Sequence, residues 1–441
     1  MKRDAREELR EIFDAAIAAV APDEALLSHL TLDGDILKVD GKEYPLANRK
    51  IFVCGGGKGA APMAKALESL LGDRIEKGVI VVKYGHQSPL NKIKCLEASH
   101  PTPDAAGERG ARACLAIAEE AGDQDLLICL FTGGASSLLS LPMPGLTLAE
   151  LREATALLLG SGANINELNA IRKHLSSISG GRLAAVARSQ VLSIIVSDVV
   201  GDDLATIASG PTSPDPSTFE DCLFILEKYH LLDKFPAAAL NILKEGANGK
   251  IPETPKPGDP AFEKTSNIIV ASNIQALRAG AAQARELGYK TEIINEPITG
   301  EAREVAVELV EIAKLQRKNL ARGDQGVCVL AGGETTARVV GAGKGGRNQE
   351  MALAAIIELS DSDGIAALFA GTDGTDGPTD ATGGFALADS LARIGSRRDA
   401  IAFLRDNDSY NALAKAGELL ITGPTRTNVM DIAILLVRAP E

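Results

Sequence analysis

The chain of 441 residues contains no tryptophan, and aromatic residues make up only 3% of it. So little aromatic surface disfavours platforms on which the bases of single-stranded nucleic acid stack. The formal net charge of −13 is spread along the chain instead of being gathered in a tail. An acidic surface of this kind argues against nucleic acid and anionic membranes as partners.

Long apolar runs are also missing, and the charged start MKRDAREELREIFDAA has no signal-peptide core. We therefore expect a soluble, cytoplasmic protein. The six cysteines include no CxxC pair, which disfavours a redox motif or a zinc site. Cys54, Cys129 and Cys328 lie inside apolar runs, so we predict that they are buried free thiols.

The most regular feature present is an alternation of short apolar runs with Ala- and Leu-rich stretches of helical period. It predicts strands over 51–56, 78–85, 126–134 and 191–198, and helices over 60–71, 105–121, 148–159 and 166–187. Continuous apolar runs suit strands that are covered on both faces. The first half therefore predicts an α/β domain with a parallel sheet between helices.

A proline-rich polar stretch over 251–260 marks the expected domain junction, and the length of the chain also favours two domains. We predict an N-terminal domain over 1–245, a linker over 246–264 and a C-terminal domain over 265–441. Further strands are expected over 266–273, 290–295, 326–334, 364–374 and 418–423. The second domain is thus also predicted as Rossmann-like α/β, with a mainly parallel sheet. The apolar segment 427–437 closes the chain as a helix or strand, and the sequence does not assign it to either sheet.

The motif GGGKG, at residues 55–59, follows a predicted strand and opens a helix. Amides of Gly56 and Gly57, with Lys58 as a mobile cation, are expected to bind an anion. Gly55, Gly57 and Ala60 also fit the loose GxGxxA dinucleotide fingerprint. That fingerprint needs an acidic residue about twenty positions on, where this chain offers Lys83. The alternative is a tight turn whose glycines only permit close packing.

Similar loops follow two more strands. In FTGGASSLL, at 131–139, Gly133, Gly134 and Ser136 would form the floor of an anion pocket, although Ser136 could equally cap a helix. In the stretch 168–183, we expect Lys173 on a solvated surface, whereas His174 could equally be functional or a packed helix residue.

Asp198 stands at a predicted strand end, where open α/β sheets bind ligands, and could hold magnesium or a substrate hydroxyl. Asp202 and Asp203, just beyond it, more often cap a helix.

Glycine, hydroxyl and carboxylate residues are most concentrated between 331 and 384. Lys344, Arg347 and the amides near Gly345 can hold phosphate oxygens, with arginine better suited to a bidentate grip. Four carboxylates offer the hard oxygen ligands that magnesium prefers: Glu334, Asp373, Asp376 and Asp380. The cluster predicts a magnesium nucleotide site. A turn-rich or calcium-type loop is the alternative, but the EF-hand spacing is missing.

At these residues the chain resembles the class II glycerate kinases, which join an N-terminal kinase domain to a C-terminal MOFRL domain. The resemblance covers nearly the whole chain and is carried by motifs in a fixed order: CGGGKGAAPMA, FTGGASSLLSLP, LNAIRKHLSSISGGRLA, SDVVGDDLATIASGPT, GGETT, GGRNQEMALA, AGTDGTDGPTDATGG and ITGPTRTNVMDI. It implies phosphorylation of D-glycerate to 2-phosphoglycerate by ATP and Mg²⁺, in a cleft between two α/β domains, with the MOFRL region at about 325–437.

The resemblance also implies that Lys58 and Arg347 are the central cations, with Glu334 and Asp373 beside them. We assign catalytic roles to Lys58, Arg347 and Asp373, and metal-binding roles to Asp198 and Asp376. Substrate and nucleotide contacts are assigned to Gly56, Gly57, Gly133, Gly134, Ser136, Asn273, Glu334, Lys344 and Gly345. Phosphoryl transfer needs such cations and positioned hydroxyls more than an elaborate nucleophile. Asp373 would orient or deprotonate the acceptor hydroxyl, or else bind magnesium.

Two other functions stay open. The loose dinucleotide fingerprint, together with the hydroxypyruvate reductase label that some similar proteins carry, motivates an NAD(P)-dependent reductase. The same loops could also serve a sensor that binds a sugar acid or phosphosugar without reacting. Expected partners are small molecules, with neither nucleic acid nor membrane, and the chain would act as a monomer or homodimer.

Overall fold

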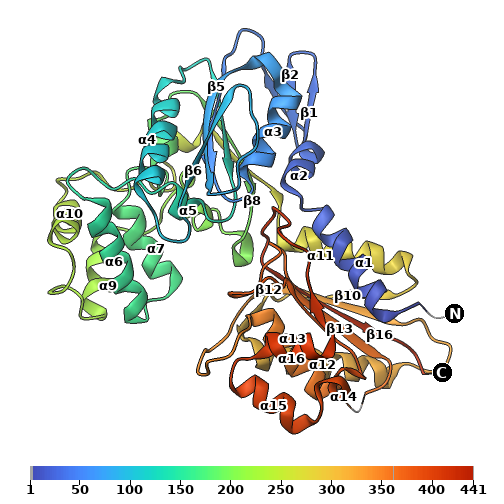
Figure 1. Cartoon of the computed structure of the whole chain (residues 1–441). Helices are drawn as coiled ribbons and strands as arrows, with labels where there is room; N and C mark the ends of the chain where they lie inside the picture. Colours follow the sequence, from blue (N-terminus) through green and yellow to red (C-terminus); the bar gives the residue numbers. More distant parts are fainter. Residues whose placement is uncertain (1–2, 361, 441) are drawn as a thin grey trace. The chain divides into compact units, whose positions relative to one another are not determined.

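The computed structural model describes residues 3–360 and 362–440, and its tertiary contacts divide the chain into two units (Figure 1). The N-terminal unit comprises Pro22–Val270. The C-terminal unit combines Met1–Ala21 with Ala271–Glu441. The predicted cleft between two domains stays a prediction.

A six-stranded sheet forms the centre of the N-terminal unit, in the order β6-β5-β4-β7-β8-β9. Its strands are β4 (Ile51–Gly56), β5 (Ile75–Lys83), β6 (Ile93–Ala98), β7 (Leu126–Phe131), β8 (Gln190–Val196) and β9 (Thr265–Ala271). The four pairings that join β6 to β8 are all parallel. Figure 1 shows α3 (Ala60–Leu71) and α4 (Ala105–Glu120) on opposite faces of this sheet. The predicted α/β architecture is confirmed here.

A helical layer with its own apolar core extends the N-terminal unit. It contains α6 (Leu148–Ser161), α7 (Ile165–His174), α9 (Phe219–Lys228) and α10 (Ala237–Ala247). The helix predicted over 166–187 is broken, because Gly180 and Gly181 adopt positive φ angles between α7 and α8 (Arg182–Val186). Shorter helical elements are α5 (Ala135–Leu138), η1 (Gly72–Arg74), η2 (Val200–Asp202), η3 (Ile207–Ser209) and η4 (Pro260–Phe262).

A small antiparallel sheet, which the sequence reading missed, follows α2 (Pro22–His29). It consists of β1 (Leu30–Asp33), β2 (Ile36–Val39) and β3 (Lys42–Pro45). Its strands are short, and only alternate residues such as Leu37, Val39 and Tyr44 are buried, so the apolar signal is weak.

The sheet of the C-terminal unit is mixed, in the order β10-β12-β16-β13-β14-β15, with β11 also beside β12. Its strands are β10 (Lys290–Ile293), β11 (Ile298–Glu301), β12 (Val327–Thr336), β13 (Ile365–Gly371), β14 (Gly383–Ala386), β15 (Leu419–Leu420) and β16 (Asp431–Val437). β10 and β11 pair with β12 in parallel, whereas β16 runs antiparallel to both β12 and β13. The prediction of a mainly parallel second sheet is therefore wrong. A strand buried on both faces has the same apolar pattern in either direction.

Helices cover both faces of this sheet, with α1 (Ala5–Ala18) and α11 (Asn273–Glu286) on one side in Figure 1. The other side carries α12 (Ala302–Asn319), α13 (Arg347–Leu359) and α16 (Ser409–Ala416). Two further helices are α14 (Ser390–Ile394) and α15 (Arg397–Arg405). The strand that the sequence could not assign, β16, lies in the middle of this sheet.

The two units differ from the predicted domain boundaries at both ends of the first domain. Helix α1 packs on α11 and buries Leu9, Ile12 and Phe13 in the C-terminal unit, although it precedes the whole N-terminal unit. Strand β9 completes the first sheet, and the expected linker belongs to the N-terminal unit, where Thr254 is buried. The apolar stripe of an amphipathic helix shows that one face is buried, but it does not identify the sheet on which the helix packs.

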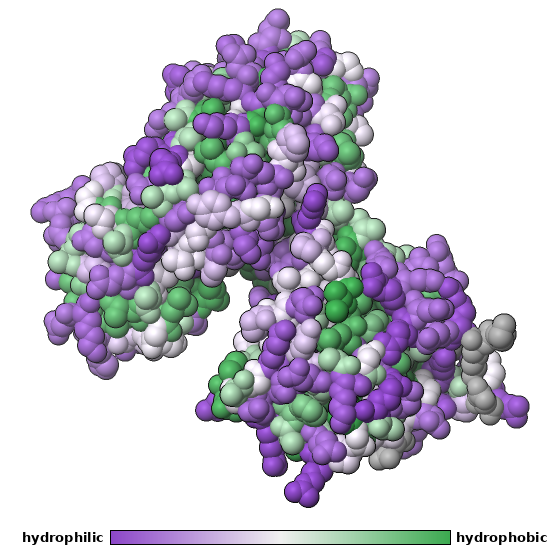
Figure 2. All heavy atoms as spheres, in the orientation of Figure 1, coloured by the Kyte–Doolittle hydropathy of each residue, from purple (hydrophilic) through white to green (hydrophobic). Residues whose placement is uncertain are grey.

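Cys54, Cys129 and Cys328 are free and buried, as predicted. No helix in the described part of the chain is both long and apolar enough to cross a membrane. On the face drawn in Figure 2, hydrophilic side chains cover most of the surface and apolar ones form scattered patches.

Candidate active site

In the N-terminal unit, the turn that carries Lys58 is packed against the end of β7. Gly55 and Gly57 have φ angles of 143° and 134°. A Cβ atom on Gly55 would lie 2.0 Å from the carbonyl oxygen of Leu130, and one on Gly57 would lie 2.1 Å from Oγ1 of Thr132. These glycines are therefore required by close backbone packing.

The amides of this turn are used inside the protein. The N–H groups of Gly57, Lys58 and Gly59 donate to the Val81 carbonyl (3.0 Å), the Gly133 carbonyl (2.9 Å) and Oγ1 of Thr132 (2.9 Å), respectively. The structure thus supports the tight-turn interpretation over an amide cradle for phosphate. It also weakens the dinucleotide fingerprint, which needs glycines that let the backbone approach a pyrophosphate.

The hydrogen bond from the Lys58 N–H to the Gly133 carbonyl places Lys58 beside the Gly133–Gly134 turn, which lies near His100. A Cβ atom on Gly134 would lie 2.8 Å from the His100 ring and 3.6 Å from Cγ of Lys58. Burial, together with the positive charges of Lys58, Lys83 and His86, lowers the pKa of His100 to about 4. His100 is therefore neutral near pH 7 in an electropositive corner of the unit.

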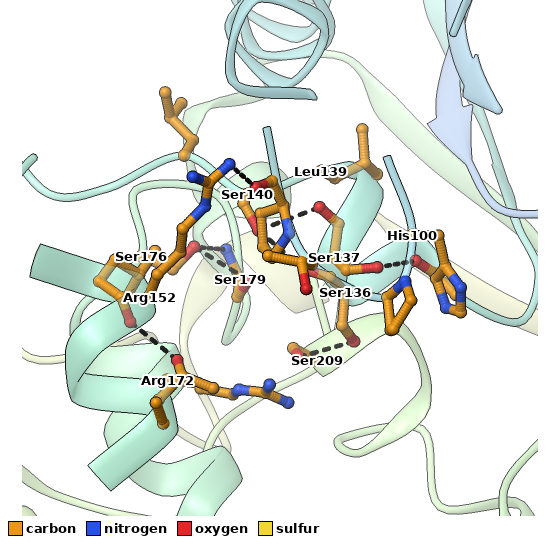
Figure 3. A pocket seen from close by; sticks show the side chains of 18 of the residues that line it. His100, Ser136, Ser137, Leu139, Ser140, Arg152, Arg172, Ser176, Ser179 and Ser209 are labelled. Atoms are coloured by element: carbon orange, nitrogen blue, oxygen red, sulfur yellow. Dashed lines mark hydrogen bonds between the residues drawn. The ribbon is translucent and has the colours of Figure 1, made fainter. Parts of the chain in front are cut away.

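Gly134 and Ser136 border a cavity of about 520 Å³ (Figure 3). Ser136 does not provide the cap of α5, because the N-cap position belongs to Gly134. Instead its hydroxyl accepts a hydrogen bond from the hydroxyl of Ser209 (2.9 Å). The glycine turn and the serines thus border a partly open cavity, and their role in binding an anion stays a prediction.

In the C-terminal unit, one edge of the sheet gathers charged residues from three strands and a helix. Because β16 runs antiparallel to its neighbours, its first residue, Asp431, lies opposite Gly333 of β12 and Gly371 of β13. Glu334 follows in β12, and Arg347 opens α13. The antiparallel strand therefore delivers a carboxylate to the edge where its neighbours end.

Arg347 is held by two carboxylates. Its Nε and Nη2 atoms donate to the two oxygens of Asp431 (2.6 and 3.0 Å), and Nη1 lies 3.0 Å from Oε1 of Glu334. Burial opposes the charge of Arg347, but the hydrogen bonds and negative charge of Asp431, followed by Glu334, raise its pKa above the usual value. The guanidinium is fixed and permanently charged.

Asp376 anchors the start of α13. Its two carboxylate oxygens accept the backbone N–H groups of Asn348 (3.2 Å) and Gln349 (2.8 Å). The Asn348 side chain bridges Asp376 (3.3 Å) and Asp431 (2.9 Å), and burial raises the pKa of Asp376 to about 6. This favours a helix-anchoring role over the predicted metal ligand. Residues 3–360 and 362–440 contain no group of three or more His, Cys, Asp or Glu side chains suited to a metal ion.

Asp373 lies just beyond β13, and its Oδ1 accepts the N–H and the hydroxyl of Thr375 (both 3.0 Å). Its negative charge helps to raise the pKa of Asp431, although burial is the larger cause. Asp373 therefore belongs to the same charged edge as Arg347.

The loop before α13 is fastened to the turn at 406–408 and not directed at a ligand. The N–H groups of Val340, Gly341, Ala342, Gly343 and Lys344 all donate to residues of this turn. A Cβ atom on Gly345 would lie 2.1 Å from Oγ of Ser409. Nζ of Lys344 lies 3.8 Å from the ring centre of Tyr410, whose hydroxyl donates to Asp380 (2.8 Å). Lys344, Gly345 and Asp380 thus have structural contacts that account for them.

Asn273 secures the start of β16. Its Nδ2 donates to the carbonyls of Val429 (2.8 Å) and Asp431 (3.0 Å), and Gly332 leaves room for it. In the N-terminal unit, Asp198 lies two residues beyond the end of β8.

Comparison with known proteins extends these observations to the whole chain. Residues 8–244 match a family model described as a domain of unknown function (DUF4147), and residues 327–431 match the MOFRL family. The chain is 40% identical over 436 residues to a glycerate 2-kinase of Pyrococcus horikoshii, covering 98% of both proteins. It is also 40% identical over 436 residues to a D-glycerate 2-kinase of Thermotoga maritima, covering 97% of both. The chain belongs to the class II glycerate kinase family.

A crystal structure of glycerate kinase from Thermotoga maritima has the same fold, with a TM-score of 0.86 and 38% identity. The match covers 98% of this chain and 99% of that one. A protein of Agrobacterium vitis that is named as a hydroxypyruvate reductase is 39% identical over 437 residues, covering 98% of this chain and 94% of that protein.

Within this class II glycerate kinase fold, two residues that shape the site escaped the sequence reading. Asp431 lies within the motif ITGPTRTNVMDI and the last apolar segment, but no role was predicted for it. His100 stands in the loop after β6 and carries no motif. Lys173 was expected on the surface, but it is buried, with Nζ 3.5 Å from Asp215. His174, which the sequence left open between function and packing, is buried and lies edge-on to Phe219.

Proposed function

We propose that this chain transfers the γ-phosphoryl group of MgATP to the 2-hydroxyl of D-glycerate. The observation that carries the proposal is the clamped Arg347 at the start of α13, in a chain that matches glycerate 2-kinases along nearly their full length. Phosphoryl transfer requires fixed positive charge more than a strong nucleophile.

Lys58 and Arg347 supply that charge. Asp431 and Glu334 each face part of the Arg347 guanidinium, yet Nη1 and Nη2 each carry a second N–H. Those N–H groups can donate to the transferring phosphoryl group or to the glycerate carboxylate. Lys58, at the His100 corner, provides the second cation.

Asp373 orients the acceptor hydroxyl or accepts its proton, while Asp198 is a carboxylate ligand for Mg²⁺. Carboxylate oxygens fit this ion, which when bound neutralises phosphate charge. We leave Asp376 out of this role, because its two oxygens already accept backbone N–H groups of α13.

The decisive experiment is three parallel incubations of the purified protein. Glycerate-dependent formation of ADP from MgATP, with no oxidation of NADH by hydroxypyruvate, supports the kinase. NADH oxidation without ADP formation would replace it with the reductase, and binding without turnover would indicate a sensor. Phosphorus NMR of the product separates 2-phosphoglycerate from 3-phosphoglycerate.

Matched variants then test the two cations. Lys58→Ala and Arg347→Lys are each expected to lower kcat by at least about 100-fold. The first removes a positive charge, and the second keeps the charge but loses the fixed set of guanidinium donors. Lys65→Ala, on the exposed face of α3, and Arg338→Lys, in an exposed loop, are the controls. Full activity in Lys58→Ala or Arg347→Lys would remove that residue from the mechanism.

A further inference from the structure

The cavity beside Ser136 combines positive charge with an apolar wall. It lies between the segment 100–103, the turn of α5, and helices α6 and α7 (Figure 3). Two arginines, Arg152 and Arg172, line it, together with the serines Ser136, Ser137, Ser140, Ser176, Ser179 and Ser209. Among the described residues, no carboxylate lines the cavity. The lining is therefore net positive and rich in hydroxyl groups.

Arg172 reaches the cavity from α7. Its side chain extends from the last turn of α7 toward Ser209 (Figure 3). Burial lowers the pKa of Arg172, and no neighbouring carboxylate opposes this effect. A partly desolvated guanidinium in this setting is stabilised by an anion that enters from the cavity.

Arg152 reaches the cavity from α6. One of its terminal nitrogens donates to the carbonyl of Pro103, whereas its buried Nε–H has no hydrogen-bond partner within residues 3–360 and 362–440. Its charge thus faces the cavity with no carboxylate beside it.

The serines add hydroxyl donors to the lining that Arg152 and Arg172 share. Ser209 donates to Ser136, so the hydroxyl hydrogen of Ser136 can be given to a ligand oxygen. Ala208 and Ser209 both adopt left-handed φ angles, of 54° and 61°, which are uncommon for residues other than glycine. Such backbone conformations concentrate at binding sites.

The remainder of the wall is apolar. It includes Leu139, Leu141, Leu151 and Leu159, and Leu159 stays 65% exposed. A cavity of about 520 Å³ is far larger than a three-carbon acid requires, and glycerate has no apolar part that would cover this wall. A nucleotide has both an anionic and a largely apolar end.

We propose that this cavity binds the nucleotide of the kinase reaction, with Arg152 and Arg172 at the phosphates and the leucine wall at the base. The inference rests on the proposed function for the identity of the ligand. Glycerate, whose carboxylate offers similar chemistry to the arginines, is the competing occupant that the experiment separates.

The test measures binding of ADP to the full chain by calorimetry, without turnover. Arg172→Gln is expected to weaken ADP binding about 10- to 100-fold, because a charge-assisted contact is lost. Arg188→Gln, an exposed arginine of the same unit outside the cavity, is the matched control and should bind as the wild type does. In steady state, the KM for ATP should rise in Arg172→Gln while the KM for glycerate changes by less than about twofold.

A second variant guards against loss of folding. Ala156 is exposed on α6 and lines the cavity, so Ala156→Phe should fill it and weaken ADP binding without disturbing the core. Ala149→Phe, exposed on the same helix outside the cavity, is its control. Unchanged ADP affinity in both Arg172→Gln and Ala156→Phe, or loss of glycerate binding alone, would overturn the proposal.

Because ADP binding is measured directly, the two proposals can fail separately. A wild-type chain that binds ADP through Arg172 but phosphorylates no glycerate would retain the cavity assignment and refute the kinase reaction. If the wild-type chain phosphorylates glycerate but both variants bind ADP with undiminished affinity, the kinase reaction is retained and the cavity assignment is refuted.

Discussion

Asp431 is the residue on which the charged edge of the C-terminal unit depends. Its buried carboxylate accepts two hydrogen bonds from Arg347 and one from Asn348. A buried ion pair adds little net stability compared with an apolar pair, but removing one partner leaves an uncompensated charge. The value of Asp431 therefore lies in fixing where the guanidinium points.

Asp431→Asn tests this positioning role. One strong acceptor of Arg347 is lost, so we expect kcat to fall about 100-fold through misplacement of the guanidinium. The free energy of unfolding should fall by about 3 kcal/mol. Kinetics and urea denaturation measure the two effects, and Asp380→Asn, at an exposed carboxylate, is the control.

A double variant, Asp431→Asn with Arg347→Lys, should lose little more activity than Arg347→Lys alone, because the two residues act as a unit. Additive losses would contradict the positioning role.

His100 predicts a dependence of stability on pH. Its pKa is about 4 in the folded chain and about 6.5 when unfolded, so the unfolded state binds more protons between these values. Stability is complete above pH 6.5 and is lost as pH falls toward 4. After allowance for partial exposure, the loss is on the order of 1–2 kcal/mol.

Urea denaturation at pH 4.5, 5.5 and 7 measures this slope, which should flatten in His100→Gln and persist in His230→Asn, at an exposed histidine. An identical slope in wild type and His100→Gln would refute the assignment.

At the scale of elements, the sequence located most strands correctly but did not reveal how those of the second sheet pair. The apolar runs around β12, β13 and β16 identify buried strands. Whether two strands pair in parallel or antiparallel depends on the connecting segments, and hydrophobic periodicity does not report this. Lys173 shows the same limit, because its partner Asp215 is 42 positions away and no local pattern links them. Motifs near glycine turns were located well, but the acceptors of their amides lie in segments distant along the chain.

The Lys58 turn offers an element-scale prediction. Gly57→Ala should destabilise the N-terminal unit by at least about 3 kcal/mol, since a Cβ atom would meet Thr132 and the φ angle is unfavourable. Gly160→Ala, in α6 with no neighbour within 4 Å, should instead stabilise by about 0.5–1 kcal/mol. Thermal unfolding compares them, and a harmless Gly57→Ala would contradict the packing role.

At the scale of the whole molecule, the two α/β units were predictable from the strand and helix rhythm, but the membership of α1 was not. Its apolar stripe of Leu9, Ile12 and Phe13 would fit either sheet. The sheet that receives it is decided by contacts with α11, a partner more than 250 residues later in the chain.

Phe13→Ala tests that membership. It should remove about 3–5 kcal/mol from the C-terminal unit, because a fully buried ring is deleted. Amide hydrogen exchange should accelerate in α11 and β16 and stay unchanged in β4 and β7. Phe224→Ala, at a ring that is 67% exposed, is the control. Faster exchange confined to the N-terminal unit would contradict the assignment of α1.

The central position of β16 has a consequence for synthesis of the chain. All strands of the first sheet are made before residue 272, so the N-terminal unit can fold while translation continues. The second sheet has to wait, since β12 and β13 are joined only through a strand made after both. Helix α1, which is made first, has no partner until α11 is made after the whole N-terminal unit. A ribosome that stalls late would therefore release a folded N-terminal unit attached to an incomplete C-terminal unit, whose exposed apolar surface is prone to aggregation.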